Sequence, residues 1–406
     1  MKTTLAFLLF AAAATAAHAQ TGTPAGPAPV TAASGRCGVC HPAERVQFER
    51  SRHAPEGVRC VSCHGGDDRS LDAGAAHGAR FRGRPARQDI PRLCATCHAD
   101  EAQMRPYNLP VDQYALYQTS GHGQRLARGD RQVAVCSDCH GAHEILTSRD
   151  PASSVYPLNI PQTCGRCHGG PAGPGARRRS DVLKLYRSSV HARALFEQGN
   201  LRSPTCVSCH GVHGASPPNI GDIDKVCGQC HTADRRYYTS GGHAVARGGN
   251  RPECAACHEA HGVQAARPER LASSCVLCHE GDARRLDLGR RLWTDYRTAA
   301  DEVDKAAALV AKADAIPIQT EDYHARIEEA RTYLREALPA AHSVQPEVVA
   351  SFTTRARAVG QEVQKEIQGK LANLRQHRYV LVAFWFYVLL TLFVLKRFRD
   401  QAARNR

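Results

Sequence analysis

The sequence predicts a mainly α-helical chain with extensive irregular loops, followed by a helical bundle and one C-terminal transmembrane helix. Three observations lead to this prediction. A short motif of cysteine and histidine recurs over residues 37–283, where aliphatic residues are scarce. Residues 284–378 lack cysteine and are rich in residues that favour helices. Residues 379–395 carry no charge, as a membrane-spanning helix requires.

All 18 cysteines belong to the pattern Cys-x-x-Cys-His, which occurs nine times. The nine motifs are Cys37-Cys40-His41, Cys60-Cys63-His64, Cys94-Cys97-His98, Cys136-Cys139-His140, Cys164-Cys167-His168, Cys206-Cys209-His210, Cys227-Cys230-His231, Cys254-Cys257-His258 and Cys275-Cys278-His279. This pattern is the attachment signature of haem c: the thiols form thioethers with the porphyrin and the histidine ligates the iron. Zinc ribbons do not need the histidine, and disulfide frameworks do not repeat a two-residue spacing. The sequence therefore predicts nine covalently bound haem c groups.

The apolar content of residues 37–283 also favours haem. About 37 Leu, Ile, Val and Phe occur among these 247 residues, roughly 15%, which on its own is typical of a disordered chain. Nine porphyrin faces supply the missing core. We therefore expect this nonahaem cytochrome c domain to be unfolded without haem, as metal-dependent domains are without metal.

The formal charge of +14 overstates how basic the loaded protein is. The propionates of nine haems remove roughly nine units of charge in the oxidised protein and about eighteen in the reduced one. Basic stretches such as residues 80–84 and 177–179 are therefore expected to neutralise propionates or to bind acidic partners. We do not expect nucleic acid as a partner.

The motifs form four repeats, each with two motifs and two further histidines, and a lone ninth motif follows. The further histidines are His53, His77, His122, His143, His191, His213, His243 and His261. Haem iron in an electron-transfer site takes two strong axial ligands, so these eight are predicted to be the second ligands. In three repeats the second of them follows a motif as His-x-x-His, on the same helical face, and is expected to bind a neighbouring haem.

The ninth motif, which ends at His279, has no further histidine in the repeats. His324, His342, His377 and Met104 are the candidates for its second axial position, and an open iron there would be a place for a substrate to bind. His342 is the predicted ligand because it lies in a turn between two expected helices, from which a side chain can reach into a site.

The segment after the motifs is predicted to be a helical bundle without chemistry of its own. Its helices are expected at about 285–314, 321–338 and 346–378, the last of which runs into the membrane span. Thr320 and the acidic residues after it predict a capped start for the second helix, and Pro339 predicts its end. A buried stripe is expected from Leu286, Leu288, Leu292, Trp293 and Tyr296.

The two ends of the chain predict its topology. Residues 1–19 have the lysine, apolar run and Ala-His-Ala site of a signal peptide, and residues 20–36 are expected to be a flexible leader. As a helix, residues 379–395 are about 26 Å long, the lower limit for a bilayer span. The basic tail, residues 396–406, favours the cytoplasm. We therefore expect an inner-membrane protein with a single C-terminal span and its haem domain in the periplasm.

The repeats resemble periplasmic multihaem c-type cytochromes of anaerobic respiration. The matching pattern is a serine and histidine before Cys-x-x-Cys-His-Gly-x-His, as in residues 120–122 with 136–143 and residues 188–191 with 206–213. The resemblance covers residues 37–279. It implies that the motif histidines are proximal ligands and the others distal ligands.

The resemblance implies an electron relay rather than an enzyme, with no catalytic residue. Such proteins carry electrons from quinol or a membrane quinol oxidoreductase to periplasmic or outer-membrane redox proteins. An alternative is a reductase of a small nitrogen or sulfur oxyanion at a five-coordinate ninth haem. The Cys-x-x-Cys-Lys motif of the ammonia-forming nitrite reductases is absent from the sequence, which weakens that alternative. A third hypothesis is a structural conduit within a larger respiratory complex.

Overall fold

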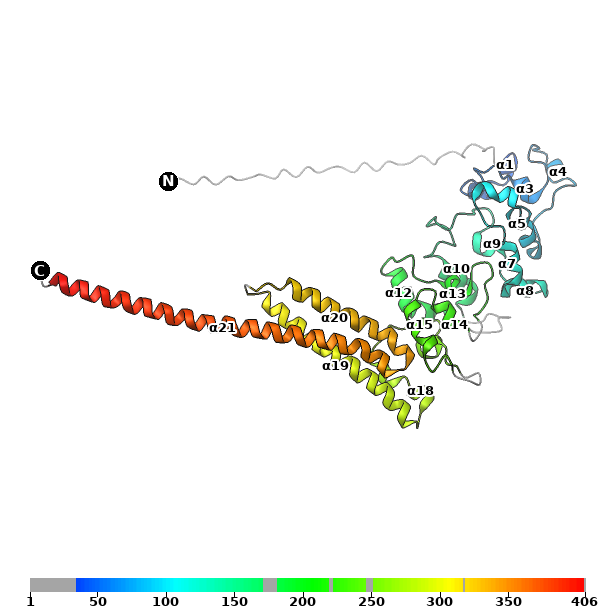
Figure 1. Cartoon of the computed structure of the whole chain (residues 1–406). Coiled ribbons are helices and arrows are strands. Elements are labelled where there is room, and N and C mark those ends of the chain that lie inside the picture. Colours follow the sequence, from blue (N-terminus) through cyan, green and yellow to red (C-terminus); the bar gives the residue numbers. More distant parts are fainter. Residues whose placement is uncertain (1–33, 171–180, 219–221, 246–250, 317, 405–406) are drawn as a thin grey trace, which may run out of the picture. The chain divides into compact units, whose positions relative to one another are not determined.

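The computed structural model describes residues 34–170, 181–218, 222–245, 251–316 and 318–404. These residues are mainly helical and contain no strand, as predicted (Figure 1). The predicted signal peptide and most of the predicted leader lie outside them. The chain forms two compact units: the first unit comprises the residues up to Val111 with Arg131–Tyr156, and the second unit comprises Asp112–Asp130 with Pro157–Arg406. This division falls within the motif region, and the predicted domain boundaries stay predictions.

The helices of both units are short up to the last motif. The first unit contains α1 Cys37–Cys40, α2 Pro42–Glu49, α3 Cys60–His64, α4 Ala73–Ala76, η1 Arg87–Asp89, α5 Ile90–His98, α6 Glu101–Met104, η2 Arg105–Tyr107 and α9 Cys136–His140. The second unit contains α7 Gln113–Thr119, α8 Gly121–Ala127, α10 Ile160–His168, α11 Val182–Ser188, α12 Val190–Phe196, α13 Cys206–His210, α14 Ile223–Cys227, α15 Thr232–Ser240, α16 Cys254–His258, α17 Arg270–Ser273 and α18 Val276–His279. Most motifs thus form one helical turn or end a helix at their histidine.

The bundle of the second unit has three long helices: α19 Ala283–Ala313, α20 Glu321–Ala340 and α21 Pro346–Arg404. The short helix η3 Ala341–Ser343 joins the last two. The predicted helices are confirmed, with starts within two residues of those expected. Thr320 precedes α20 as predicted, but its hydroxyl bonds to Asp314 Oδ1 at 2.6 Å rather than to the helix. Helix α20 ends at Ala340, one residue after Pro339 and near the predicted end, and a proline in a last turn lacks only one helical hydrogen bond.

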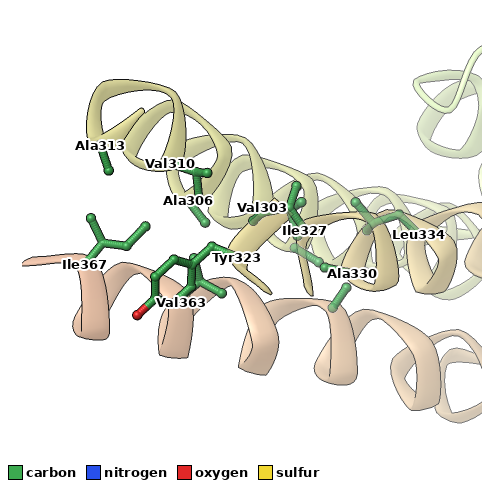
Figure 2. Close-up of a cluster of buried hydrophobic side chains, with 12 residues drawn as sticks. Val303, Ala306, Val310, Ala313, Tyr323, Ile327, Ala330, Leu334, Val363 and Ile367 are labelled. Atoms are coloured by element: carbon green, nitrogen blue, oxygen red, sulfur yellow. The ribbon is translucent and has the colours of Figure 1, made fainter. Parts of the chain in front are cut away.

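Small and β-branched side chains form the core of the bundle (Figure 2). The buried residues are Ala299, Val303, Ala306, Val310, Ala313, Tyr323, Ile327, Ala330, Leu334, Ala356, Val363 and Ile367. Of the predicted stripe, Leu292 is buried and the other four are half-buried. At Gly360 a Cβ atom would lie 3.2 Å from the Glu302 carbonyl oxygen, so α19 and α21 approach closely there. Burial of each large apolar side chain contributes about 1.5–3 kcal/mol.

Helix α21 has 59 residues and continues well beyond its partners (Figure 1). Its buried positions end at Ile367, and the residues that follow are mostly exposed, with Leu371 half-buried against the core. The apolar part has a mean hydropathy of 2.1 and is exposed throughout its most apolar stretch, so α21 is long and apolar enough to cross a membrane. At about 1.5 Å per residue, the helix covers roughly 50 Å between Pro346 and Tyr379.

Candidate haem sites

Within each of the two units, the structure places motif histidines opposite a second histidine, and eight such pairs are described. The pairs, with the distance between ring centres, are His41–His77 (6.2 Å), His98–His53 (6.0 Å), His64–His143 (6.2 Å), His168–His122 (6.1 Å), His231–His191 (6.3 Å), His210–His261 (6.0 Å), His279–His243 (6.4 Å) and His258–His342 (6.0 Å). Each pair joins one motif histidine to one histidine outside the motifs, and none joins two of a kind.

These distances fit two imidazoles on opposite sides of one iron. A metal–nitrogen bond of about 2.0 Å and about 1.2 Å from the nitrogen to the ring centre, on each side of the iron, give roughly 6.4 Å between ring centres. The described residues contain no group of three or more His, Cys, Asp and Glu side chains arranged for a metal ion. Isolated pairs beside Cys-x-x-Cys therefore fit haem, whose porphyrin supplies the other four ligands, better than zinc.

The pairing follows the order of the repeats. The first additional histidine of each repeat faces the first motif of the next: His53, His122, His191 and His243 face His98, His168, His231 and His279. In the opposite direction, His143 and His261 face the second motif of the preceding repeat, at His64 and His210. Neighbouring repeats thus exchange facing histidines, and the expectation that the second histidine of His-x-x-His binds a neighbouring haem stays a prediction.

The two ends of the array depart from this order. No repeat precedes His41, and His77 from the same repeat faces it. At the other end, His342 faces His258, whereas His279 of the ninth motif faces His243. His342 therefore lies beside a motif histidine, but not beside the one for which it was predicted. The bundle supplies the histidine that a further repeat would have supplied.

The other candidates for the ninth motif lie elsewhere. His324 Nε2 is 3.1 Å from Asp314 Oδ1, on the exposed surface of the bundle. His377 is an exposed residue of α21, and Met104 is buried in α6 of the first unit. His140 belongs to the first unit and His213 to the second, and both stay predicted ligands.

Buried serines position several of the histidines. Ser120 and Ser189 are fully buried, and their hydroxyls accept hydrogen bonds from the third residue on, at 2.9 and 3.1 Å, to begin α8 and α12. This N-cap places His122 and His191 in the first helical turn, two residues after the serine. Ser51 precedes His53 by the same two residues and accepts a hydrogen bond from its backbone N–H at 3.2 Å. The serine–histidine pattern in the sequence is therefore a helix-start signal at His122 and His191.

The paired rings are prepared to ligate through Nε2. Nδ1 lies within hydrogen-bonding distance of a carbonyl oxygen in His64 (Gly83, 3.0 Å), His77 (Ala73, 2.9 Å) and His210 (Ser216, 3.1 Å). Such a contact holds the hydrogen on Nδ1 and leaves Nε2 for the metal. Burial lowers the pKa of His53, His98, His143, His191, His243, His258 and His261. The neutral imidazole is the form that binds iron.

The cysteines bring consecutive motifs together. Within each repeat the first thiols of the two motifs lie close enough to interact: Cys37–Cys60, Cys94–Cys136, Cys164–Cys206 and Cys227–Cys254. Between repeats the second thiols interact electrostatically: Cys63–Cys97, Cys209–Cys230 and Cys257–Cys278. Where these sulfurs form thioether links to haem, they would hold the porphyrins of consecutive motifs close to one another. The motifs of each unit are thus neighbours in the order of the sequence.

Comparison with known proteins gives one match. Residues 53–103 match a family described as the doubled CXXCH motif. No curated protein and no solved structure matches the chain. The doubled motif indicates covalently bound haem c in a multihaem c-type cytochrome, which is an electron-transfer haem protein.

Proposed function

We propose that this chain is a periplasmic electron relay with nine haem c groups, tethered to the inner membrane by α21. We number the haems 1–9 in the order of their motifs. The relay takes electrons from a membrane quinol oxidoreductase and passes them to a periplasmic or outer-membrane redox protein, in an anaerobic respiratory chain. The signal peptide and the basic tail after the apolar part of α21 support this topology.

The order of the thiols is the observation that carries the proposal. Electron transfer slows steeply as the gap between redox centres widens, so a relay needs each haem close to the next. In the first unit the thiols of motifs 1 to 4 interact electrostatically with those of the next motif in sequence order, and in the second unit those of motifs 5 to 9 do so as well. Such an arrangement supports haems 1–4 and haems 5–9 as two continuous series.

The histidine pairs favour a relay over the alternative reductase. A reductase needs an iron with one open position, a shaped cavity and proton donors. The ninth motif was the candidate for that iron, but its His279 lies opposite His243 at a distance that fits two axial ligands. The pairs at the other seven motif histidines would likewise occupy both axial positions of their irons.

The bundle favours an oxidoreductase, rather than quinol itself, as the electron donor. Helices α15, α17 and α18, which belong to motifs 7 to 9, contact η3, α19 and α20 at the end of the bundle where α21 begins. The apolar part of α21 starts roughly 50 Å further along the helix. A helix that stands upright in the membrane would hold these haems far above the quinol.

Sustained turnover tests the proposal. The purified protein is reduced and offered nitrite, hydroxylamine or tetrathionate while haem reoxidation is followed over many turnovers. A relay is expected to show at most slow, stoichiometric reoxidation, because irons with two histidine ligands have no open position. Rapid and sustained turnover of any one of the three without a partner protein would make the chain a reductase and overturn the proposal.

A further inference from the structure

We propose that Asp234 is a positioning residue that lowers the reduction potentials of haems 7 and 8 together. The inference rests on the proposed roles of His231 as the proximal ligand of haem 7 and of His342 as the distal ligand of haem 8. The carboxylate of Asp234 faces both rings on the side of Nδ1. Asp234 belongs neither to a Cys-x-x-Cys-His motif nor to the further histidines of the repeats.

The two oxygens of Asp234 are divided between the two histidines. Oδ2 lies 3.7 Å from Nδ1 of His231, and Oδ1 lies 3.5 Å from Nδ1 of His342. Both contacts are in the range of charge interactions rather than of direct hydrogen bonds. If iron takes Nε2, each Nδ1 carries the hydrogen, and both Nδ1 atoms lie near the same negative charge.

The fold holds this carboxylate in place. His231 precedes α15 and Asp234 lies in its first turn, where the helix dipole favours a negative charge. The other end of α15 contacts η3: a Cβ atom at Gly241 would lie 2.7 Å from the Ser343 carbonyl oxygen, and Gln345 donates to the Ser240 carbonyl at 3.3 Å. His342 is therefore fixed against the helix that carries Asp234.

His342 also has a neutral contact, since its Nδ1 lies 3.1 Å from the Pro339 carbonyl oxygen. Carbonyl oxygens face Nδ1 of His64, His77 and His210 in the same way, without a carboxylate in those contacts. A full negative charge near an axial imidazole stabilises ferric iron more than ferrous iron, and such outer contacts tune haem potentials. We therefore expect haems 7 and 8 to be harder to reduce than they would be with carbonyl contacts alone.

The two haems concerned are consecutive in the relay. The first thiols of their motifs, Cys227 and Cys254, lie close enough to interact. One side chain thus acts on both centres of the same electron-transfer step. Asp234 lowers both potentials together, so the difference in potential between haems 7 and 8 changes little. The differences in potential between this pair and haems 6 and 9 change more.

A potentiometric titration of the full-length protein tests this role. The variant Asp234→Asn keeps the shape of the side chain and removes its charge. We expect two of the nine haems to become easier to reduce, each by about tenfold in the ratio of ferrous to ferric iron, which is about 59 mV for a one-electron couple. The haem content and the low-spin spectrum should stay unchanged, since both ligands remain.

Asp301→Asn is the matched control, because it removes the same charge from an exposed position of α19. An equal shift in this control, or no shift in Asp234→Asn, would overturn the role of Asp234. A third variant, His342→Ala, separates that failure from failure of the ligand assignment. If it produces high-spin iron while Asp234→Asn has no effect, only the role of Asp234 is wrong. If it produces none, the assignment of His342 as a ligand fails, and the inference fails with it.

Discussion

The motif region and the bundle are both helical, but different interactions hold them together. In the bundle, valine, isoleucine and alanine from three long helices form a continuous buried core. In the motif region the helices are short, and consecutive segments meet through thiols and pairs of imidazoles. Helical structure therefore depends on side-chain packing in the bundle and, as we propose, on haem in the motif region.

Loss of haem should therefore have the largest effect, and in one region only. When the chain is produced without haem attachment, we expect the motif region to be unfolded and protease-sensitive, because its aliphatic content cannot form a core. The bundle should remain helical and resist digestion. Limited proteolysis with mass spectrometry checks this, and a protected fragment from the motif region would contradict it.

A core substitution in the bundle should have a smaller effect than loss of haem. It should destabilise the bundle and leave the motif region unchanged. Ile367→Ala removes a fully buried side chain and is expected to lower the free energy of unfolding of the bundle by about 2–5 kcal/mol. Thermal unfolding followed by circular dichroism measures this, while the haem spectrum should not change. Arg331→Ala, at an exposed position of α20, should change stability by less than about 0.5 kcal/mol and serves as the control.

His342 tests the point where the two regions meet. We expect His342→Ala to convert one haem of nine to high-spin iron, because His258 loses the ring opposite it. His324→Ala should have no effect on the haems, since His324 contacts Asp314 instead. Electron paramagnetic resonance of the oxidised proteins measures both. High-spin iron in the His324 variant alone would reverse the assignment.

The smallest effect concerns ring orientation within the motif region. The imidazole planes of His41 and His77 are 88° apart, whereas those of His243 and His279 are 8° apart. Perpendicular ligands give low-spin iron a more anisotropic resonance than parallel ligands do. We expect His77→Ala to remove a strongly anisotropic signal and His243→Ala to remove a less anisotropic one, and the opposite assignment would show that the ring orientations are wrong.

The sequence predicted the parts of the molecule that depend on local patterns. Motif spacing predicted haem attachment, and periodicity predicted α19, α20 and the start of α21 within two residues. It did not predict which histidine faces which motif, because ligand exchange between repeats is a tertiary feature. His342 shows the limit: its position in a turn was recognised, but its partner depends on how η3 packs against α15. Asp234 was missed as well, although its place three residues after His231 in a first helical turn was visible.

Quantification of haem and of iron spin state in the intact, oxidised protein is the most direct test of nine haems with two histidine ligands each. Haem content by absorbance and mass, combined with integrated electron paramagnetic resonance, should give nine haems per chain. We expect nearly all of them to be low-spin, since eight motif histidines face a second histidine within 6.4 Å between ring centres. A mostly high-spin spectrum, or fewer haems than motifs, would contradict it.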